Sequence, residues 1–448
     1  MSDLNALLSA HAADFPVDAV PADLAASLSR NLTDGLAAIV GGSNAPGVDE
    51  LAGLVTGISK FGAAQVIAGG GRWPAIVAAQ INATAGHALD FDDTLDEGGG
   101  MHAGALVHAA TLAVADELGG VSGKAYLSAV AVGLDIAVRL ALAPTRDFGW
   151  HRTSAFGIFG VVGAVGRLLG LNREQFANAF GIAYSQASGN RQCIADGALS
   201  KRLQAGFAAR DGITAVHLAR LGVTGASRSF EGTDGFFTLY QRGEYRREVV
   251  TQGLGTDLLA GRIALKPYPC GRNLHALLDA SFRARAAHGG RMIARIDVHV
   301  PAVAARHARA DWPAHVVEAQ FSVPFVLALS TQAGRTDLAD FAAPDSVAPD
   351  VRALGDHVAI VPHVEQGAED RIVFHYADGT RHSEAIEAVA LGNPARPLDL
   401  AVVQDKFRSA NRYVGAPLSD VAVERVLALA ADLPVLADTR ELTAALAI

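Results

Sequence analysis

The segment HALDFDDTLDEGGGMH, residues 87–102, holds the densest group of ionisable side chains in this 448-residue chain. Histidine exchanges protons near neutral pH, and carboxylates can orient a histidine or bind a hard cation. If the segment is helical through residue 94, spacings of three and four residues place His87, Asp90 and Thr94 on one face, and the aspartates at 92 and 93 point elsewhere. The spacing therefore predicts a polar face suited to proton transfer.

Three glycines, residues 98–100, end this expected helix and allow His102 to return toward the same face. They predict either a mobile lid or a tight turn with positive φ angles. The competing interpretation of the whole segment is a solvated acidic helix end followed by a flexible loop. Apolar side chains within the segment favour partial burial instead: Ala88, Leu89 and Phe91.

DDTLD, residues 92–96, matches the magnesium–diphosphate motif of isoprenoid synthases. Carboxylates at this spacing can hold a hard cation. The chain is only 6% aromatic, however, whereas carbocation chemistry needs an aromatic-lined pocket, and no second acidic motif is present to face the first. We therefore expect no metal and keep a magnesium-dependent isoprenoid synthase as a remote alternative.

Two further segments of the helical part supply candidate side chains. GWHRTS, residues 149–154, contains His151 beside a tryptophan that could bury its ring and tune its pKa. SQASGNRQCIADGALSKRLQAG, residues 185–206, combines small residues with Arg191 and Lys201, which could pair with a substrate carboxylate. The competing interpretations are a structural histidine and ordinary exposed cations on a surface loop.

KPYPCGRNLH, residues 266–275, follows these segments at a change in the sequence pattern. Its two prolines stiffen the chain, and it brings Lys266, Arg272 and His275 to a boundary between two expected domains. Pockets are common at domain boundaries, so we count these three residues as candidates.

The composition excludes several classes of protein. The formal net charge is −9 and no run of Lys or Arg occurs, which argues against nucleic-acid binding. Two cysteines, Cys193 and Cys270, cannot build a disulfide framework, a zinc site or an iron–sulfur cluster. The N-terminus does not resemble a signal peptide, and the most apolar stretch (156–171) is too short to cross a membrane. We expect a cytoplasmic protein without a membrane partner.

The elements that must position these residues follow from periodicity. Apolar residues recur every three or four positions up to about residue 260, which predicts helices, including 102–118 and one capped by Asn172 and Gln175. Alternation then predicts strands at 291–301, 357–365 and 371–387, with a hairpin turn at Asp378-Gly379, before helices return near 399. The expected fold is mainly α: a large all-helical domain (1–265 plus 396–448) with an inserted smaller α+β domain (266–395).

The order of the motifs resembles that of the MmgE/PrpD family. The resemblance rests on HALDFDDT, then H-x-G-x-x-V, G-x-H, the DG…K…G segment and KPYPC-x-R-x-x-H. A weaker similarity continues through DWPAHVVEAQFSVPF (311–325) and DKFR (405–408). The family includes 2-methylcitrate dehydratase, cis-aconitate decarboxylase and iminodisuccinate epimerase.

The resemblance implies a helical domain built from both ends of the chain, a smaller α+β domain, an active site between them, a homodimer and no cofactor. It also implies the active-site residues, by position: Asp90, Thr94, His102, His151, Lys201 and His275. Two departures concern the decarboxylase. The loop before His102 is longer and richer in glycine, and Phe325 stands where that enzyme has a tyrosine hydroxyl. Decarboxylation of cis-aconitate is therefore the least expected of the three reactions.

All three reactions can pass through a carbanion or enediolate beside a carboxylate, which requires a base and fixed positive charges. We predict a cofactor-free lyase of a small di- or tricarboxylate that resembles 2-methylcitrate dehydratase. An epimerase of an iminodisuccinate-like dicarboxylate is the alternative, and a non-enzymatic binding protein is the remaining class. The candidates are catalytic (Asp90, His102, His151, Lys201, His275) and substrate-binding (Thr94, Arg191, Lys266, Arg272).

Overall fold

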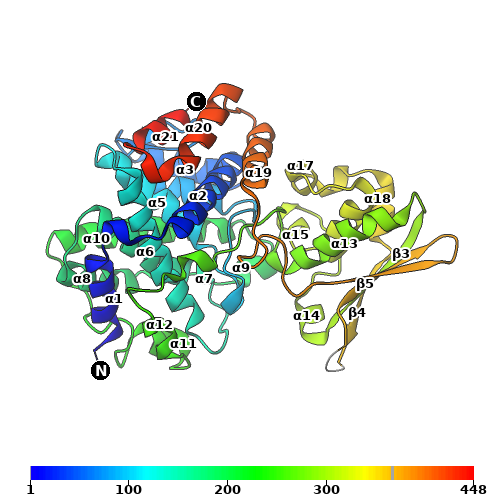
Figure 1. Ribbon diagram of the computed structural model, residues 1–448, viewed down its shortest axis with the longest axis horizontal. Helices are drawn as coiled ribbons and strands as arrows, with labels where there is room; N and C mark the ends of the chain where they lie inside the picture. Colours follow the sequence, from blue (N-terminus) through cyan, green and yellow to red (C-terminus); the bar gives the residue numbers. More distant parts are fainter. Residues whose placement is uncertain (1, 365–367, 448) are drawn as a thin grey trace. The chain divides into compact units, whose positions relative to one another are not determined.

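The computed structural model describes residues 2–364 and 368–447 and is mainly helical, with a small sheet (Figure 1). The chain divides into two compact units. The first comprises Met1–Ala88, Asp92–Leu265 and Asp399–Ile448, and the second comprises Leu89–Phe91 and Lys266–Leu398.

The first unit is a bundle of helices with one short hairpin, β1 (Ala64–Gln65) and β2 (Arg72–Trp73). Its helices are α1 (Leu4–Asp14), α2 (Ala22–Gly42), α3 (Val48–Gly57), α4 (Ala75–Gly86), α5 (Ala103–Glu117), α6 (Gly123–Leu142), α7 (Arg152–Leu168), α8 (Arg173–Tyr184), α9 (Gln192–Ala195), α10 (Ser200–Arg220), α11 (Phe236–Gln241), α12 (Arg247–Thr251), α19 (Leu400–Tyr413), α20 (Asp420–Ala431) and α21 (Arg440–Ala445).

Helices α6 and α7 pack closely in the centre of this unit because glycines line their contact. A Cβ atom at Gly133 would lie 2.5 Å from the backbone oxygen of Gly160, so only glycine fits there. Helix α6 is long and apolar enough to cross a membrane, but 94% of its most apolar stretch is buried by the rest of the protein. A helix that is apolar on all sides is typical of such a central position.

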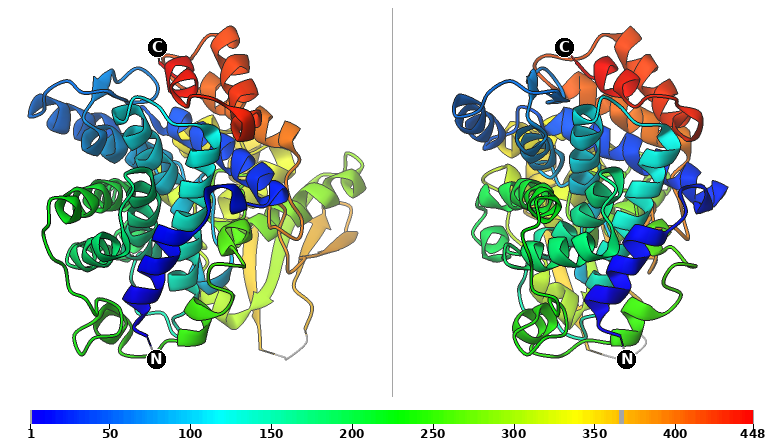
Figure 2. Two further views of the ribbon diagram at one scale, coloured as in Figure 1. Left: turned by 60° about the vertical axis from the view of Figure 1, so that its left-hand side comes forward. Right: turned by 90° about the vertical axis from the view of Figure 1, so that its left-hand side faces the viewer.

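The C-terminal helices α19 and α20 pack on α2, near the other end of the chain; Figure 2 shows them in orange to red beside the blue α2. A buried ion pair joins α19 to α2, with 2.6 Å between Lys406 Nζ and Asp34 Oδ1. Both ends of the sequence therefore belong to one helical core.

The second unit contains a four-stranded sheet in the order β4-β3-β5-β6. Strands β3 (Ile293–Pro301) and β4 (Val358–His363) are parallel, whereas β5 (Arg371–Tyr376) is antiparallel to both β3 and β6 (Arg381–Ala385). Its helices are α13 (His275–His288), α14 (Ala302–His307), α15 (Val316–Ala319), α16 (Val323–Ala328), α17 (Leu338–Ala342) and α18 (Pro349–Gly355).

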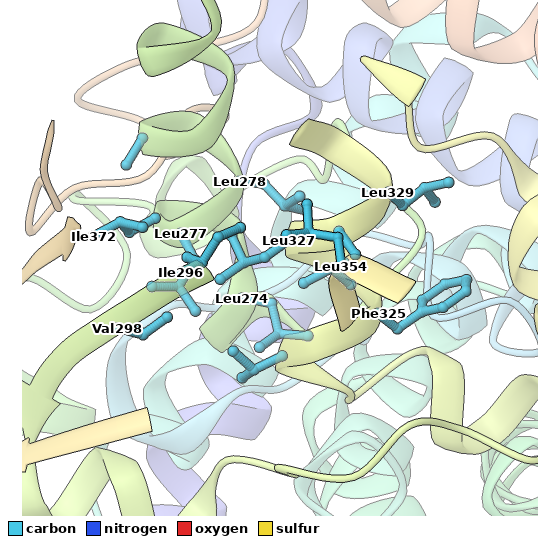
Figure 3. Close-up of a cluster of buried hydrophobic side chains, with 14 of the residues drawn as sticks. Leu274, Leu277, Leu278, Ile296, Val298, Phe325, Leu327, Leu329, Leu354 and Ile372 are labelled. Carbon is cyan, nitrogen blue, oxygen red and sulfur yellow. The ribbon is translucent and has the colours of Figure 1, made fainter. Parts of the chain in front are cut away.

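The core of the second unit lies between the sheet and its helices. Leucines of α13 and of the α16 segment meet Ile296 and Val298 of β3 and Ile372 of β5 (Figure 3). Phe325 is fully buried here, with T-shaped contacts to Trp312 and Phe341 at ring distances of 5.4 and 5.2 Å. The phenyl ring therefore fills core space.

Several local expectations are confirmed. Asn172 and Gln175 form the expected capping box at the start of α8, and α5 ends before Gly119. Strands occupy the three expected segments, and the hairpin turns at Asp378-Gly379. Glu365, the last residue of one expected strand, lies outside the described residues.

Candidate functional site

The segment after α4 is not the helix that its spacing predicts. Helix α4 ends at Gly86, and Asp90 adopts a left-handed backbone with φ of 52°. Two backbone hydrogen bonds of 2.8 and 2.7 Å then pair Thr94 with Ala264. The expectation that His87, Asp90 and Thr94 share a helical face is therefore wrong, because a left-handed residue cannot continue a right-handed helix.

The turn brings three histidines and an aspartate together inside the first unit. His87 Nδ1 lies 2.7 Å from Asp92 Oδ2, and His87 Nε2 lies 3.3 Å from His151 Nε2. The ring of His102 is 5.1 Å from the ring of His87, and its Nδ1 is 3.6 Å from Asp92 Oδ1. These four residues form the histidine cluster.

His102 is the member of the cluster with the most exposed side chain, at 13%. It precedes α5, and its backbone N–H donates to Thr153 Oγ1 at 3.0 Å. Its Nδ1 is 2.6 Å from the carbonyl oxygen of Asp93. Because a carbonyl oxygen only accepts, Nδ1 carries the hydrogen, and neutral His102 has its basic lone pair on Nε2.

His151 is held at the N-terminus of α7. Its backbone N–H donates to the carbonyl oxygen of Gly189 at 3.2 Å, and its side chain is buried. The positive end of a helix disfavours a protonated histidine, so this position favours the neutral ring. Trp150 stacks on Tyr240, with ring centroids 4.3 Å apart.

The side chain of Asp93 anchors the turn to helices α5 and α2. Both carboxylate oxygens accept from the backbone N–H of Gly104 in the first turn of α5, and Asn31 donates to Oδ2 at 3.2 Å. Burial, with the nearby charges of Asp92 and Asp34, nevertheless raises the pKa of Asp93 to about 8. The Asp93 side chain therefore acts as a helix cap, and its carbonyl oxygen contacts His102 of the histidine cluster.

The two cationic side chains of the segment 185–206, Lys201 and Arg191, differ in burial. Lys201 lies in the first turn of α10 and is buried, at 6% exposure. Arg191 is 43% exposed at its side chain and forms an ion pair with Asp147 at 2.5 Å. Lys201 therefore remains a candidate, whereas the structure gives Arg191 a surface partner.

Asp90 and Lys266 form a buried ion pair within the second unit. Lys266 Nζ donates to the backbone oxygen of Asp90 at 3.0 Å and to its Oδ1 at 3.1 Å. The exposed fractions of the two side chains are 0% for Lys266 and 2% for Asp90. The left-handed backbone of Asp90 and this double contact hold the carboxylate in one position.

His275 and Arg272 lie on the same segment as Lys266. Burial, with the positive charges of Arg272 and Lys266, keeps the pKa of His275 well below its ordinary value. Arg272 Nη1 lies 3.3 Å from His275 Nδ1, and His275 Nε2 lies 3.3 Å from the carbonyl oxygen of Cys270. Arg272 also donates to the carbonyl oxygen of Leu391 at 2.8 Å. His275 is therefore a neutral imidazole whose Nε2–H is the donor.

The histidine cluster also contains a set of potential metal ligands. One atom from each of His87, Asp92 and His102 lies within 4.8 Å of the others. His87 Nδ1 is hydrogen bonded to Asp92, however, and His102 Nδ1 to the Asp93 carbonyl oxygen. A cation bound through either Nδ1 atom would displace these contacts, and we assign no metal ligand here.

Comparison with known proteins places the chain. A family model described as the MmgE/PrpD N-terminal domain matches residues 6–248, and the model for the MmgE/PrpD C-terminal domain matches residues 268–432. The chain belongs to the MmgE/PrpD family. The second match extends through α19 and the whole of α20, which the structure includes in the first unit.

Curated relatives of this MmgE/PrpD chain carry decarboxylase names. A cis-aconitate decarboxylase-like protein, oryM, of Aspergillus oryzae is 29% identical over 58% of this chain and 57% of its own length. The cis-aconitate decarboxylase of Aspergillus terreus is 26% identical over 84% and 83% of the two chains. That of Homo sapiens is 27% identical over 83% and 79%. The match thus covers less than two thirds of oryM.

Sequence reasoning missed the partnership of His87 with Asp92. Both residues lie in the segment 87–102, but in a continuous helix their side chains would point in different directions. The only sequence signal was the aspartate at 90, because Asp tolerates the left-handed backbone better than most residues. Such a turn can return Asp92 to the ring of His87.

Proposed function

We propose that this chain is a lyase that removes a proton next to a carboxylate of a small di- or tricarboxylate, without a cofactor. The observation that carries the proposal is the tautomer of His102. Its Nδ1 is committed to the Asp93 carbonyl oxygen, which leaves Nε2 as the base, and the ring is partly exposed. The family supports a polycarboxylate lyase, because curated relatives of this chain are named cis-aconitate decarboxylases.

The chemistry sets what the other residues must do. A carbon next to a carboxylate is a very weak acid, so fixed positive charge is needed where negative charge develops. Lys201 can supply such a charge, and its burial would strengthen the contact. The remaining roles that we propose are catalysis for Asp90, His151 and His275, and substrate binding for Thr94, Arg191, Lys266 and Arg272.

Loss of a β-hydroxyl after proton removal would make the chain a dehydratase, and we propose this outcome. Return of the proton to the opposite face would give epimerisation, which is the alternative. The names of the relatives point to decarboxylation, but identities of 26–29% do not transfer a substrate. Phe325 also supplies no hydroxyl and is buried among aromatic rings.

The magnesium-dependent alternative has little support. Asp92 holds His87, and Asp93 caps α5, so two of the three carboxylates of DDTLD have partners within the fold. We further propose that the enzyme is cytoplasmic and homodimeric and that it binds neither nucleic acid nor membrane.

The test is the turnover of citrate, 2-methylcitrate, cis-aconitate and iminodisuccinate by His102→Gln. Glutamine keeps the size of the side chain but cannot act as a base. We expect kcat to fall about 100-fold or more, since a general base contributes ~10²–10⁴. His357→Gln, at an exposed histidine of the second unit, is the matched control and should match the wild type. If His102→Gln turns over substrate as fast as His357→Gln, His102 is not the base.

A further inference from the structure

His87 occupies a position that proton transfer from substrate does not explain. Its side chain has no exposure, and both of its ring nitrogens face protein groups. It nevertheless lies within hydrogen-bonding distance of two ionisable groups, Asp92 at 2.7 Å and His151 at 3.3 Å. A buried polar side chain held at both ends is suited to orienting a neighbour.

The order of the hydrogen bonds defines which nitrogen carries each hydrogen. The carboxylate of Asp92 accepts, so His87 Nδ1 is protonated and its Nε2 has the lone pair. That lone pair must then accept the Nε2–H of His151, because two nitrogens at 3.3 Å share one hydrogen. Neutral His151 consequently has its basic nitrogen at Nδ1.

We propose that Asp92 and His87 are positioning residues that fix the tautomer of His151. The inference rests on the proposed function for its effect on turnover, and it adds two residues that act through a third. The N-terminal end of α7 contributes, because it disfavours a second proton on His151. His151 would thus present Nδ1 as an acceptor.

Asp92→Asn tests the inference most sharply. With its NH2 group toward the ring, the amide donates to His87 Nδ1, and the hydrogen of His87 moves to Nε2. His151 Nε2 must then accept, and its own hydrogen moves to Nδ1. Side-chain volume and buried packing change little, so a merely structural role for Asp92 predicts no such exchange.

The measurement is solid-state NMR of the full chain with ¹⁵N-labelled histidine, without substrate. His151→Gln identifies the two His151 signals by their absence. We expect Nε2 of His151 to be protonated in the wild type and Nδ1 to be protonated in Asp92→Asn. Asp49→Asn, on the exposed side of α3, is the control and should leave the signals unchanged. Asp92→Leu has no acceptor for His87 Nδ1, so unchanged His151 signals in both Asp92→Asn and Asp92→Leu would overturn the inference.

Turnover supplies the second readout. Asp92→Asn should lower kcat about 100-fold with KM changed less than about threefold, because Asp92 and His87 act through His151. His87→Gln offers an acceptor to His151 and should retain more activity than His87→Leu. If the wild type shows the stated tautomer but turns over no polycarboxylate, the proposed function fails and the positioning stands. If the wild type is active and Asp92→Asn equals it, the positioning fails.

Discussion

Asp93 is a carboxyl group whose environment opposes its ionisation. Burial and two neighbouring aspartates raise its pKa to about 8, whereas the unfolded chain has the ordinary value of 3.8. Between these values the folded state binds the extra proton, so this group's contribution to stability falls as pH rises from about 4 to about 8 and is constant above that.

Asp93→Asn should remove this pH dependence, because an amide does not ionise. The difference in melting temperature between variant and wild type should therefore shift in favour of the variant as pH rises from 5 to 8. Thermal unfolding at several pH values measures it. Parallel curves for the two proteins would show that Asp93 titrates in the ordinary range.

Lys266 and Asp90 provide a second prediction at this scale. Lys266→Met leaves the Asp90 carboxylate buried without its cation, which should cost about 3–5 kcal/mol of unfolding free energy. The double variant Lys266→Met/Asp90→Asn should recover much of that loss, since no charge remains. Denaturant unfolding compares the three proteins. A loss below about 1 kcal/mol in the single variant would mean that water reaches the pair.

Residue types alone revealed which side chains could do chemistry, but not how they meet. His102 and His151 were candidates because histidine is the usual base near neutral pH. Asp92 was set aside because an uninterrupted helix was assumed, and the left-handed Asp90 that reverses the chain is a property of one φ angle. Arg191 was included for its charge, although its surface partner, Asp147, lies 44 residues away in sequence.

Among the elements, the turn at Glu97–Gly99 (η2) has the geometry of the tight-turn alternative. Gly99 and Gly100 have φ angles of 93° and 74°. The turn is closed by a hydrogen bond of 2.7 Å from Leu95 N–H to the carbonyl oxygen of Met101. Glycine therefore meets a backbone requirement here.

Gly100→Ala should destabilise the fold by about 1–3 kcal/mol, since its φ of 74° and ψ of 107° suit glycine alone. A Cβ there would touch nothing within 4 Å, so any loss comes from the backbone and not from a clash. Gly53→Ala in α3 is the matched control, because it is helical and equally open. It should gain about 0.5–1 kcal/mol. Unchanged stability with lower kcat in Gly100→Ala would instead favour a mobile lid.

Gly133→Ala tests the close approach of α6 and α7. The new methyl group would lie 2.5 Å from the backbone oxygen of Gly160 and 2.7 Å from the Cβ of Ala164, so the helices must move apart. We expect a loss of about 1–3 kcal/mol in unfolding free energy. A variant as stable as the wild type in denaturant would show that the contact is looser than described.

Periodicity and turn chemistry were enough to predict most elements. Strands β5 and β6 alternate in burial as their sequence does. The register leaves residues 377–379 as a three-residue hairpin loop, in which Gly379 has a φ angle of 82°. The expected helix beyond His87 failed because the hydrogen bonds between Thr94 and Ala264 are formed with a segment 170 residues away. The helix propensity of residues 87–94 carries no information about a hydrogen-bond partner that lies so far away in the sequence.

For the whole molecule, membership of the units depends on long-range contacts. Residues 89–91 belong to the second unit although their neighbours in sequence belong to the first. The change of sequence pattern near Lys266 is visible in the sequence. The three residues 89–91 are too few to show a periodicity that would assign them to either unit. The structure assigns the pair of Asp90 and Lys266 to one unit, which no spacing rule indicates.

Activity should not require a metal ion, because the Nδ1 atoms of His87 and His102 already have hydrogen-bond partners in Asp92 and in the Asp93 carbonyl oxygen. We expect the same kcat after dialysis against EDTA as before it. Activity lost on chelation and restored by magnesium or zinc would instead assign a cation to His87, Asp92 and His102.

The central claim is proton removal next to a carboxylate, and proton NMR in deuterium oxide tests it most directly. The full chain is incubated with citrate, 2-methylcitrate, cis-aconitate and the iminodisuccinate isomers. We predict that solvent deuterium enters one substrate or its product at the carbon beside a carboxylate, and that His102→Gln abolishes this incorporation. The account is contradicted if no deuterium enters any of these compounds at that carbon, or if His102→Gln exchanges as fast as the wild type.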